Sequence, residues 1–162
     1  NTLTQHDALP ISPRLPWPVA VAGEPRHPDG GVRPSLLRLL GRLSGEELAG
    51  WLGRASIYAL PARYEPFGLS VLEAALSGCA LVLGGIPSLR EVWGDAACYA
   101  PPGDTAALEQ TLLGLIRDEA LRCEMASRAG RRALAYAPER MAQGYLAEYR
   151  ALTPARESRA AR

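Results

Sequence analysis

The sequence has few cysteines and few histidines, and these shortages exclude several kinds of site. The three cysteines, Cys79, Cys98 and Cys123, are far apart and form no CxxC pair, so neither a disulfide framework nor a zinc knuckle is indicated. The two histidines, His6 and His27, lie in polar stretches without partners at ligand spacing. We therefore expect reduced cysteines in a cytoplasmic protein, and no bound metal or other cofactor.

An excess of charge and a long apolar run are also missing. The 18 Lys and Arg residues nearly balance the 17 Asp and Glu residues, which leaves a net charge of +1. A dedicated nucleic-acid-binding protein usually carries a basic surplus, so the near-neutral balance argues against that class. No apolar run approaches the ~18 residues that a membrane-spanning helix needs. With 162 residues, 48% of them hydrophobic, the chain can bury a core as one domain, or two at most.

The first twelve residues, NTLTQHDALPIS, have an explanation that does not involve protein structure. Codons for the stretch from His6 to Ile11 match a common sequencing adapter, so we interpret residues 1–12 as a non-native segment read from an adapter. The alternative is a natural loop that matches by chance. On the first interpretation the gene is truncated at its 5′ end, and residues 1–12 are expected to be unpacked.

From Pro16 onwards, short apolar runs alternate with helical patterns. Strands are predicted at 19–22, 36–40, 57–60, 80–83 and 97–99, with a Pro- and Gly-rich loop at 23–34. Helices are predicted behind a capping box at 44–47, at 69–77, and behind a second capping box at 88–91. A cap at Asp104 opens a run of helices to about residue 152, with a break at Pro138 and a tail at 153–162.

This alternation predicts an α/β fold. Short strands separated by helices favour a Rossmann-like parallel sheet with helices on both faces, here followed by a C-terminal helical extension. In such sheets, ligands bind beyond the carboxyl ends of the strands, near helix N-termini. The loops after Leu60 and Leu83 are therefore the first places to look for a site.

The loop after Leu60 has the features of an anion site. Pro66 disfavours helix at the preceding residue, so Glu65 is expected on an extended turn. Gly68 leaves backbone amides uncovered where the next helix begins, and free N–H groups at a helix N-terminus suit a diphosphate. The hydroxyl of Ser70 adds a donor, and Glu73 follows about a turn further on.

Two carboxylates beside an anion site need an explanation, because they repel a ligand that is phosphate alone. They suit a ligand in which phosphates join a sugar to a ribose, since hydroxyl groups at both ends then require acceptors. Ionised carboxylates are the strongest acceptors that a protein offers.

Glu65 and Glu73 form an E-x7-E motif, which resembles that of retaining glycosyltransferases with the two-lobed GT-B fold, especially family 4. The segment EPFGLSVLE at residues 65–73 is similar to the family pattern at nearly every position. The resemblance extends from about residue 15 to 152 and includes the stretches at 40–44 and 101–104. Residues 13–152 are thereby identified as a nucleotide-sugar-binding C-terminal domain, incomplete at its start.

The resemblance implies a role for each part of the motif. Glu65 is the implied catalytic residue, facing the transferring sugar, while the amides of residues 67–69 hold the phosphates and Glu73 binds the ribose. The implied donor-binding residues are Glu65, Pro66, Phe67, Gly68, Leu69, Ser70, Glu73 and Gly41. The implied partners are a nucleotide-sugar donor, an acceptor that the sequence does not identify, and an N-terminal acceptor lobe upstream. Peripheral association of the full-length enzyme with a membrane stays open.

Other interpretations of the same residues also stay open. Glu65 and Glu73 can be incidental loop and helix residues, and Arg42 and Arg63 can be ordinary surface arginines or can neutralise phosphate. A retaining glycosidase would use the two glutamates as an acid and nucleophile pair about 5–5.5 Å apart. A third reading of the chain is a sugar-nucleotide-binding fragment without catalysis.

Overall fold

The computed structural model of the protein describes residues 14–23 and 37–153. Segment 1–12, nearly all of the predicted loop at 23–34 and the tail from residue 154 lie outside these ranges. The expectation that residues 1–12 are unpacked therefore stays a prediction.

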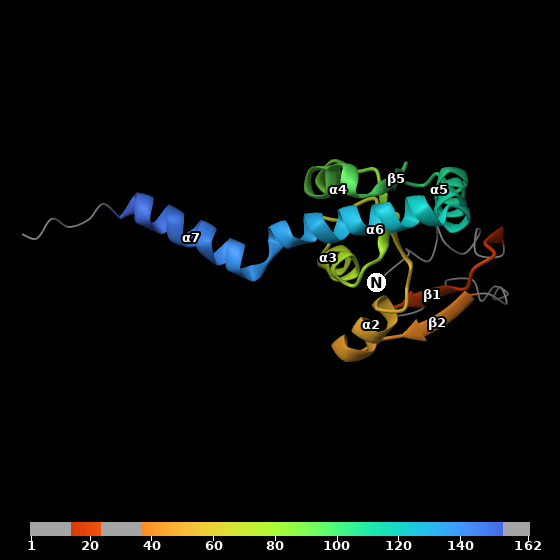
Figure 1. Cartoon of the computed structure of the whole chain (residues 1–162). Coiled ribbons are helices and arrows are strands. Elements are labelled where there is room, and N and C mark those ends of the chain that lie inside the picture. The colour runs from red at the N-terminus through yellow and green to blue at the C-terminus, as the bar shows by residue number, and fades with distance from the viewer. Residues whose placement is uncertain (1–13, 24–36, 154–162) are drawn as a thin grey trace, which may run out of the picture.

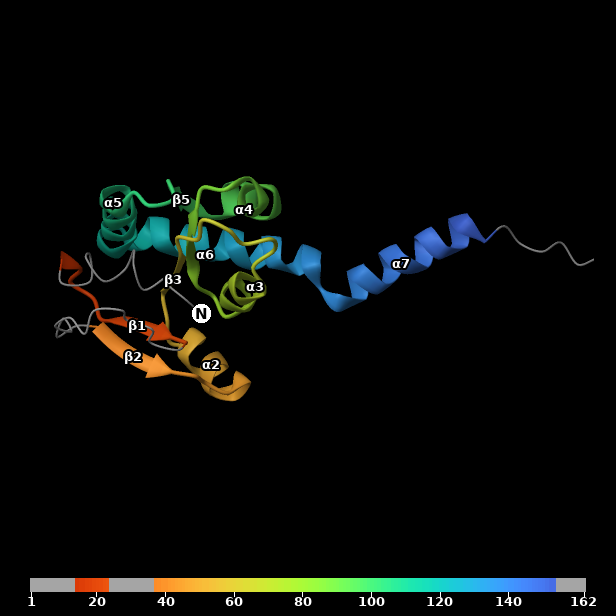
Figure 2. The ribbon, with the colours of Figure 1, turned by 180° about the vertical axis from the view of Figure 1, so that it is seen from behind.

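The strands form two parallel ladders. Strands β3 (Ile57–Leu60), β4 (Ala80–Gly84) and β5 (Cys98–Ala100) pair in that order in a three-stranded parallel sheet. Strands β1 (Val19–Ala22) and β2 (Leu37–Gly41) pair in parallel with each other. Figure 2 shows the β1–β2 ladder and the neighbouring helix α2 below the three-stranded sheet. The predicted parallel α/β architecture is confirmed, and each predicted strand begins within one residue of the observed one.

Helices cover both faces of the three-stranded sheet (Figure 1). Helices α3 and α4 contribute to one buried cluster, α5 contributes to the other, and α6 contributes to both. The helices are α2 (Gly45–Leu52), α3 (Leu69–Leu76), α4 (Pro87–Trp93), α5 (Thr105–Arg117), α6 (Glu119–Ala133) and α7 (Pro138–Leu152), with 3₁₀ turns η2 (Gly94–Ala96) and η3 (Leu134–Tyr136). None of these described helices is both long and apolar enough to cross a membrane.

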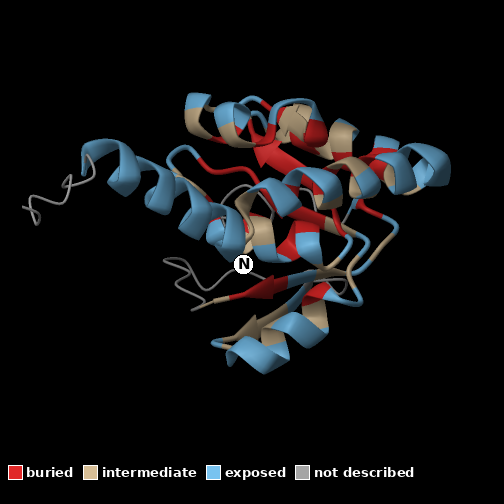
Figure 3. Cartoon of the chain, turned by 60° about the vertical axis from the view of Figure 1, so that its left-hand side comes forward, coloured by how far each residue is buried: buried red, intermediate tan, exposed pale blue. Residues whose placement is uncertain are grey.

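The two-sided core follows from the alternation of side chains along each strand. Tyr58 and Leu60 of β3 pack in the cluster with α3 and α4, whereas Ala59 between them packs in the cluster with α5. Strand β4 is buried along its whole length, as Figure 3 shows for the strands at the centre of the molecule. A strand buried on both faces has to be apolar throughout, which explains the unbroken run from Ala80 to Leu83.

Capping residues fix several helix starts. Ser44 and Glu47 form the predicted capping box at α2, with the Ser44 amide 2.8 Å from Glu47 Oε2. Asp104 caps α5 as predicted, its Oδ1 accepting the Ala107 N–H at 2.9 Å. A further cap, at Asp118, separates α5 from α6.

The second predicted capping box, at 88–91, is wrong. A cap at Ser88 would start the helix at residue 89, but α4 begins two residues earlier, at Pro87, and Ile86 precedes it without a side-chain cap. The proline starts the helix itself, because its fixed φ suits the first helical position. Ser88 instead donates from Oγ to the backbone oxygen of Glu65 at 2.6 Å.

The predicted helix break at Pro138 is confirmed. Helix α6 passes through η3, and Pro138 then opens α7. Helix α7 projects from the body of the molecule (Figure 1), and none of its residues is buried. It is the predicted C-terminal helical extension.

Candidate functional site

A cavity of about 410 Å³ lies where the N-terminus of α3 meets the carboxyl ends of β1 and β2. This is the edge at which parallel α/β sheets hold ligands, and the volume is in the range of ligand sites. The predicted loop after β3 reaches this cavity through α3. The lining residues are Ala22, Gly23, Arg42, Leu43, Leu48, Leu69, Ser70 and Glu73.

The turn before α3 depends on Gly68. Its φ of +80° lies in the left-handed region, and a Cβ there would come within 2.8 Å of Val71 Cγ2, so only glycine fits without strain. The Gly68 N–H donates to Glu65 Oε1 at 2.9 Å, which holds this carboxylate against the turn. The Gly68 amide was expected to bind a phosphate of the ligand, but in the structure it binds Glu65 instead. The bond from Ser88 to the Glu65 backbone holds the same loop to α4.

Two amides at the start of α3 are left for a ligand. The amides of Val71 and Leu72 both donate to the Gly68 oxygen, at 2.9 and 3.1 Å. Those of Leu69 and Ser70 have no acceptor within the described part of the chain. Both residues line the cavity, and the positive end of the helix dipole adds to the attraction of an anion.

Tyr58 and Ser70 form a hydroxyl pair at this edge. Tyr58 donates to Ser70 Oγ at 2.9 Å from a buried position on β3. Burial raises the pKa of Tyr58 to about 12, and the nearby charges of Glu65 and Glu73 add to the increase. Of the two glutamates, Glu73 lines the cavity together with Ser70, whereas Glu65 is not among the lining residues.

Glu73 and Arg42 both line the cavity, whereas Gly41 and Arg63 do not. Glu73 is exposed one helical turn after Leu69. Gly41 ends β2 with a φ of +68°, and its backbone oxygen accepts the Gly23 N–H at 2.8 Å. It therefore holds Gly23, a lining residue, in place without lining the cavity itself. The Arg63 guanidinium lies against Gly103 instead: a Cβ added to Gly103 would come within 2.7 Å of Arg63 Nη2.

Phe67 points to a different surface. Its ring packs edge-on against Tyr136 with centroids 5.4 Å apart, and it lines a groove of about 810 Å³ between α3 and the chain from η3 into α7. Pro66 is exposed. The groove is walled almost wholly by apolar side chains, with Arg140 the one charged residue. Because apolar walls cannot replace the hydration of a diphosphate, the smaller polar cavity is the better candidate site.

Two residues at the site were not identified from the sequence. Ser88 binds the backbone of Glu65, which lies 23 positions away in the sequence. Tyr58 binds Ser70, which lies 12 positions away. For Tyr58 the sequence holds one signal: a tyrosine in a buried apolar strand needs a hydrogen-bond partner for its hydroxyl. In the described ranges, no group of three or more His, Cys, Asp or Glu side chains could hold a metal ion.

This chain is similar to known proteins. The family model for glycosyl transferases group 1 matches residues 9–118. The chain is 32% identical over 136 residues to O-antigen chain mannosyltransferase B of Escherichia coli, covering 79% of this chain and 35% of that protein. It is 33% identical over 143 residues to glycogen synthase of Mycobacterium tuberculosis, covering 80% of this chain and 34% of that protein.

Solved structures share the fold at lower identity. Sucrose-phosphate synthase from Thermosynechococcus elongatus superposes with a TM-score of 0.74 at 21% identity, covering 90% of this chain and 41% of that one. Anabaena Alr3699/HepE in complex with UDP gives a TM-score of 0.76 at 17% identity, covering 93% and 45%. These likenesses show that the chain shares the fold of a part of each of these structures.

The chain spans about a third of the length of the curated relatives it matches. The family match nevertheless covers more than half of this chain and includes the whole loop from β3 into α3. The chain therefore belongs to the glycosyl transferases group 1 family.

Proposed function

We propose that this chain is the donor-binding portion of a retaining, family 4 glycosyltransferase. The full-length enzyme would transfer a glycosyl group from a nucleoside-diphosphate sugar to an acceptor. One observation carries the proposal: the unpaired amides of Leu69 and Ser70 open into one cavity with the cation of Arg42 and the carboxylate of Glu73. This combination suits a ligand that is both anionic and rich in hydroxyl groups.

The reaction breaks the bond between the anomeric carbon and a phosphate oxygen, and the acceptor oxygen bonds to that carbon while its proton passes to the leaving phosphate oxygen. Negative charge then grows on the leaving diphosphate, which fixed amides and Arg42 stabilise. Glu73 accepts hydrogen bonds from the ribose hydroxyls. Glu65 keeps one carboxylate oxygen on Gly68, while its Oε2 has no hydrogen-bond partner in the described ranges. Glu65 does not itself line the cavity, and we assign it to the transferring sugar, beyond the phosphates. This scheme assigns no role to a metal ion.

Relatives support a nucleotide-bound donor. Solved structures of Anabaena Alr3699/HepE contain UDP, UDP-glucose, or UDP with glucose. The matching part, 45% of each of those chains, has the fold of this chain, with TM-scores of 0.74 to 0.76. We therefore propose a nucleoside diphosphate as the group that fills the cavity.

Calorimetric titration tests this assignment. UDP, GDP and ADP are titrated separately into the chain, its Glu73→Ala variant and its Glu148→Ala variant. Glu148 is a matched control, because it is an exposed carboxylate on α7 and does not line the cavity. We expect one nucleotide to bind, Glu73→Ala to weaken its binding by about 10- to 150-fold, and Glu148→Ala to leave its binding unchanged. Absence of binding for all three nucleotides, or equal effects of both substitutions, would reject the site.

The stereochemical part has its own test. The full-length enzyme is given an α-linked nucleotide sugar, and the anomeric proton coupling of the product is measured by NMR before the product can equilibrate. An α-linked product supports retention, and a β-linked product excludes it.

A further inference from the structure

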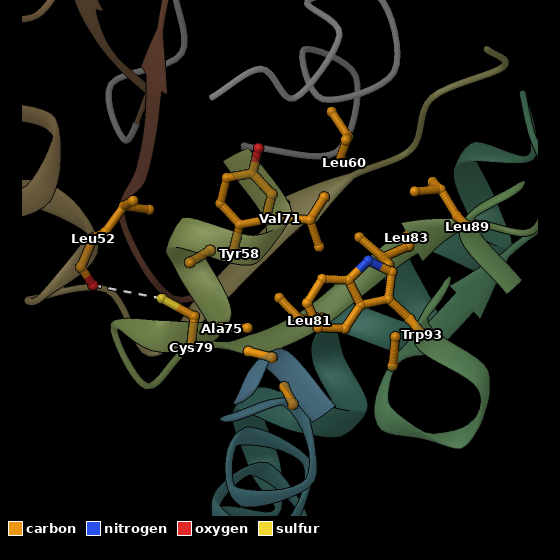
Figure 4. Packing of buried hydrophobic residues seen from close by; sticks show 14 of the residues in the cluster. Leu52, Tyr58, Leu60, Val71, Ala75, Cys79, Leu81, Leu83, Leu89 and Trp93 are labelled. Atoms are coloured by element: carbon orange, nitrogen blue, oxygen red, sulfur yellow. Dashed lines mark hydrogen bonds between the residues drawn. The ribbon is translucent and has the colours of Figure 1, made fainter. Parts of the chain in front are cut away.

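Tyr58 reaches the edge of the proposed donor site from inside the core. The side chain is 7% exposed and packs in the cluster formed by β3, β4, α3 and α4 (Figure 4). Its hydroxyl lies 2.9 Å from Ser70 Oγ, on the first turn of α3. A buried phenol needs a hydrogen-bond partner, and Ser70 is the partner that the structure provides.

The direction of this hydrogen bond decides what Ser70 can do. If Ser70 donated to Tyr58, the buried phenolic hydrogen would lack an acceptor, which is unfavourable. With Tyr58 as the donor, the Ser70 hydrogen is left over, and it has no acceptor within the described residues. Because burial raises the pKa of Tyr58 to about 12, the phenol keeps its proton at neutral pH.

We propose that Tyr58 is a positioning residue that makes the Ser70 hydroxyl a committed donor to a phosphate oxygen of the nucleotide. The inference rests on the proposed function and adds a third donor beside the amides of Leu69 and Ser70. Three donors at one point favour an anionic oxygen over a sugar hydroxyl, because a hydroxyl can accept few of them while it also donates. Tyr58 itself touches no ligand and acts only through Ser70.

A double-mutant cycle isolates this indirect action. The nucleotide that binds best among UDP, GDP and ADP is titrated calorimetrically into Tyr58→Phe, Ser70→Ala and the double variant. We expect each single substitution to weaken binding by about 3- to 10-fold, the worth of one hydrogen bond. The double variant should bind no more weakly than Ser70→Ala, because Tyr58 has nothing to orient once the hydroxyl is gone.

Two further variants separate positioning from general damage to the fold. Ser70→Thr keeps the hydroxyl, so it should retain both affinity and sensitivity to Tyr58→Phe. Tyr99→Phe removes another partly buried phenol, one that donates to the Gly94 backbone oxygen at 2.9 Å, and should leave affinity unchanged. If Tyr58→Phe does not fold, NMR of the Tyr58 hydroxyl proton replaces it. The nucleotide should then shift that resonance in the wild type and not in Ser70→Ala.

The outcomes distinguish this inference from the function on which it rests. If Ser70→Ala binds like the wild type, or if the two substitutions weaken binding additively, the positioning role is wrong. The donor site then still stands, provided that Glu73→Ala weakens binding. A wild-type chain that binds none of the three nucleotides would remove both the site and the inference.

Discussion

At the scale of single residues, the two glutamates of the E-x7-E stretch have different surroundings. Glu65 is half-buried on the turn, with Oε1 fixed by the Gly68 amide, whereas Glu73 is exposed on α3 and lines the cavity. Substitutions of Glu65 and of Glu73 should therefore change different kinetic constants of a full-length enzyme.

Glu65→Gln should mainly lower kcat. The glutamine can still accept the Gly68 N–H, but it removes negative charge near a centre that becomes cationic in the transition state. Glu73→Ala should mainly raise KM for the donor, because it removes a contact made equally in ground and transition states, worth about 1.5–3 kcal/mol. Donor kinetics and calorimetric binding of the nucleoside diphosphate measure both effects. If both variants weaken nucleotide binding alike, the division of roles is wrong.

The buried phenol of Tyr58 should make the free energy of unfolding fall at alkaline pH. Its pKa is raised by burial to about 12 from an ordinary value of 10.0. Above pH 10 the unfolded chain therefore loses this proton before the folded one does, and stability falls as the pH rises through 12. The full effect is on the order of 3 kcal/mol.

Urea unfolding of the wild type and Tyr58→Phe at several pH values between 8 and 12 measures this effect. The variant should be the less stable protein at pH 8, and the difference should shrink as the pH rises. Cys79, whose pKa burial raises to about 11, titrates in both proteins and cancels in the comparison. A difference that does not change with pH would show that the Tyr58 phenol is not buried as described.

The sequence predicted a site at Glu65, Ser70 and Glu73 because they occupy a local pattern of turn and helix residues. Ser70 and Glu73 line the cavity, and Glu65 does not. The sequence did not identify Tyr58, because its bond to Ser70 forms only when β3 and α3 pack together. Likewise, the occupation of the Gly68 amide by Glu65 depends on how the turn closes.

At the scale of elements, burial explains both the successes and the error. Strands β3 and β4 lie in apolar runs bounded by polar or glycine residues, so their positions are evident from the sequence. The start of α4 was misplaced because Ser88 and Glu91 have the spacing of a capping box. Ser88 is in fact used by a loop 23 residues away, a contact that no local pattern encodes.

Helix α7 should contribute little to the stability of the domain. A chain ending at Ala137 loses no buried residue, so its free energy of unfolding should change by less than about 0.5 kcal/mol. Removal should also improve solubility, because it deletes exposed apolar side chains. These are Met141, Tyr145, Leu146, Tyr149 and Leu152.

A second truncation serves as the control for α7. Ending the chain at Arg117 also removes α6, whose Met125, Ala129 and Ala133 are buried in the two core clusters. That chain should lose its cooperative unfolding transition by circular dichroism. A large drop in the melting temperature on removal of α7 alone would mean that α7 packs on the body.

At the scale of the whole molecule, the candidate site is an open cavity on one α/β unit. The walls come from the start of α3 and the ends of β1 and β2, and the chain spans about a third of the length of its curated relatives. Binding of a donor and transfer of its sugar should therefore be separable properties.

The 162-residue chain should fold and bind a nucleoside diphosphate, yet catalyse no transfer. Each favourable charge contact at an exposed helix terminus contributes about 0.3–1 kcal/mol, which supports weak binding but not the stabilisation of a transition state. UDP-, GDP- and ADP-sugars are supplied to this chain and to the full-length enzyme, and nucleotide release is followed. Only the full-length enzyme should turn over, and EDTA should change neither its rate nor nucleotide binding by the short chain. Robust turnover by the 162-residue chain would contradict this account, because the cavity walls described here would then suffice for catalysis.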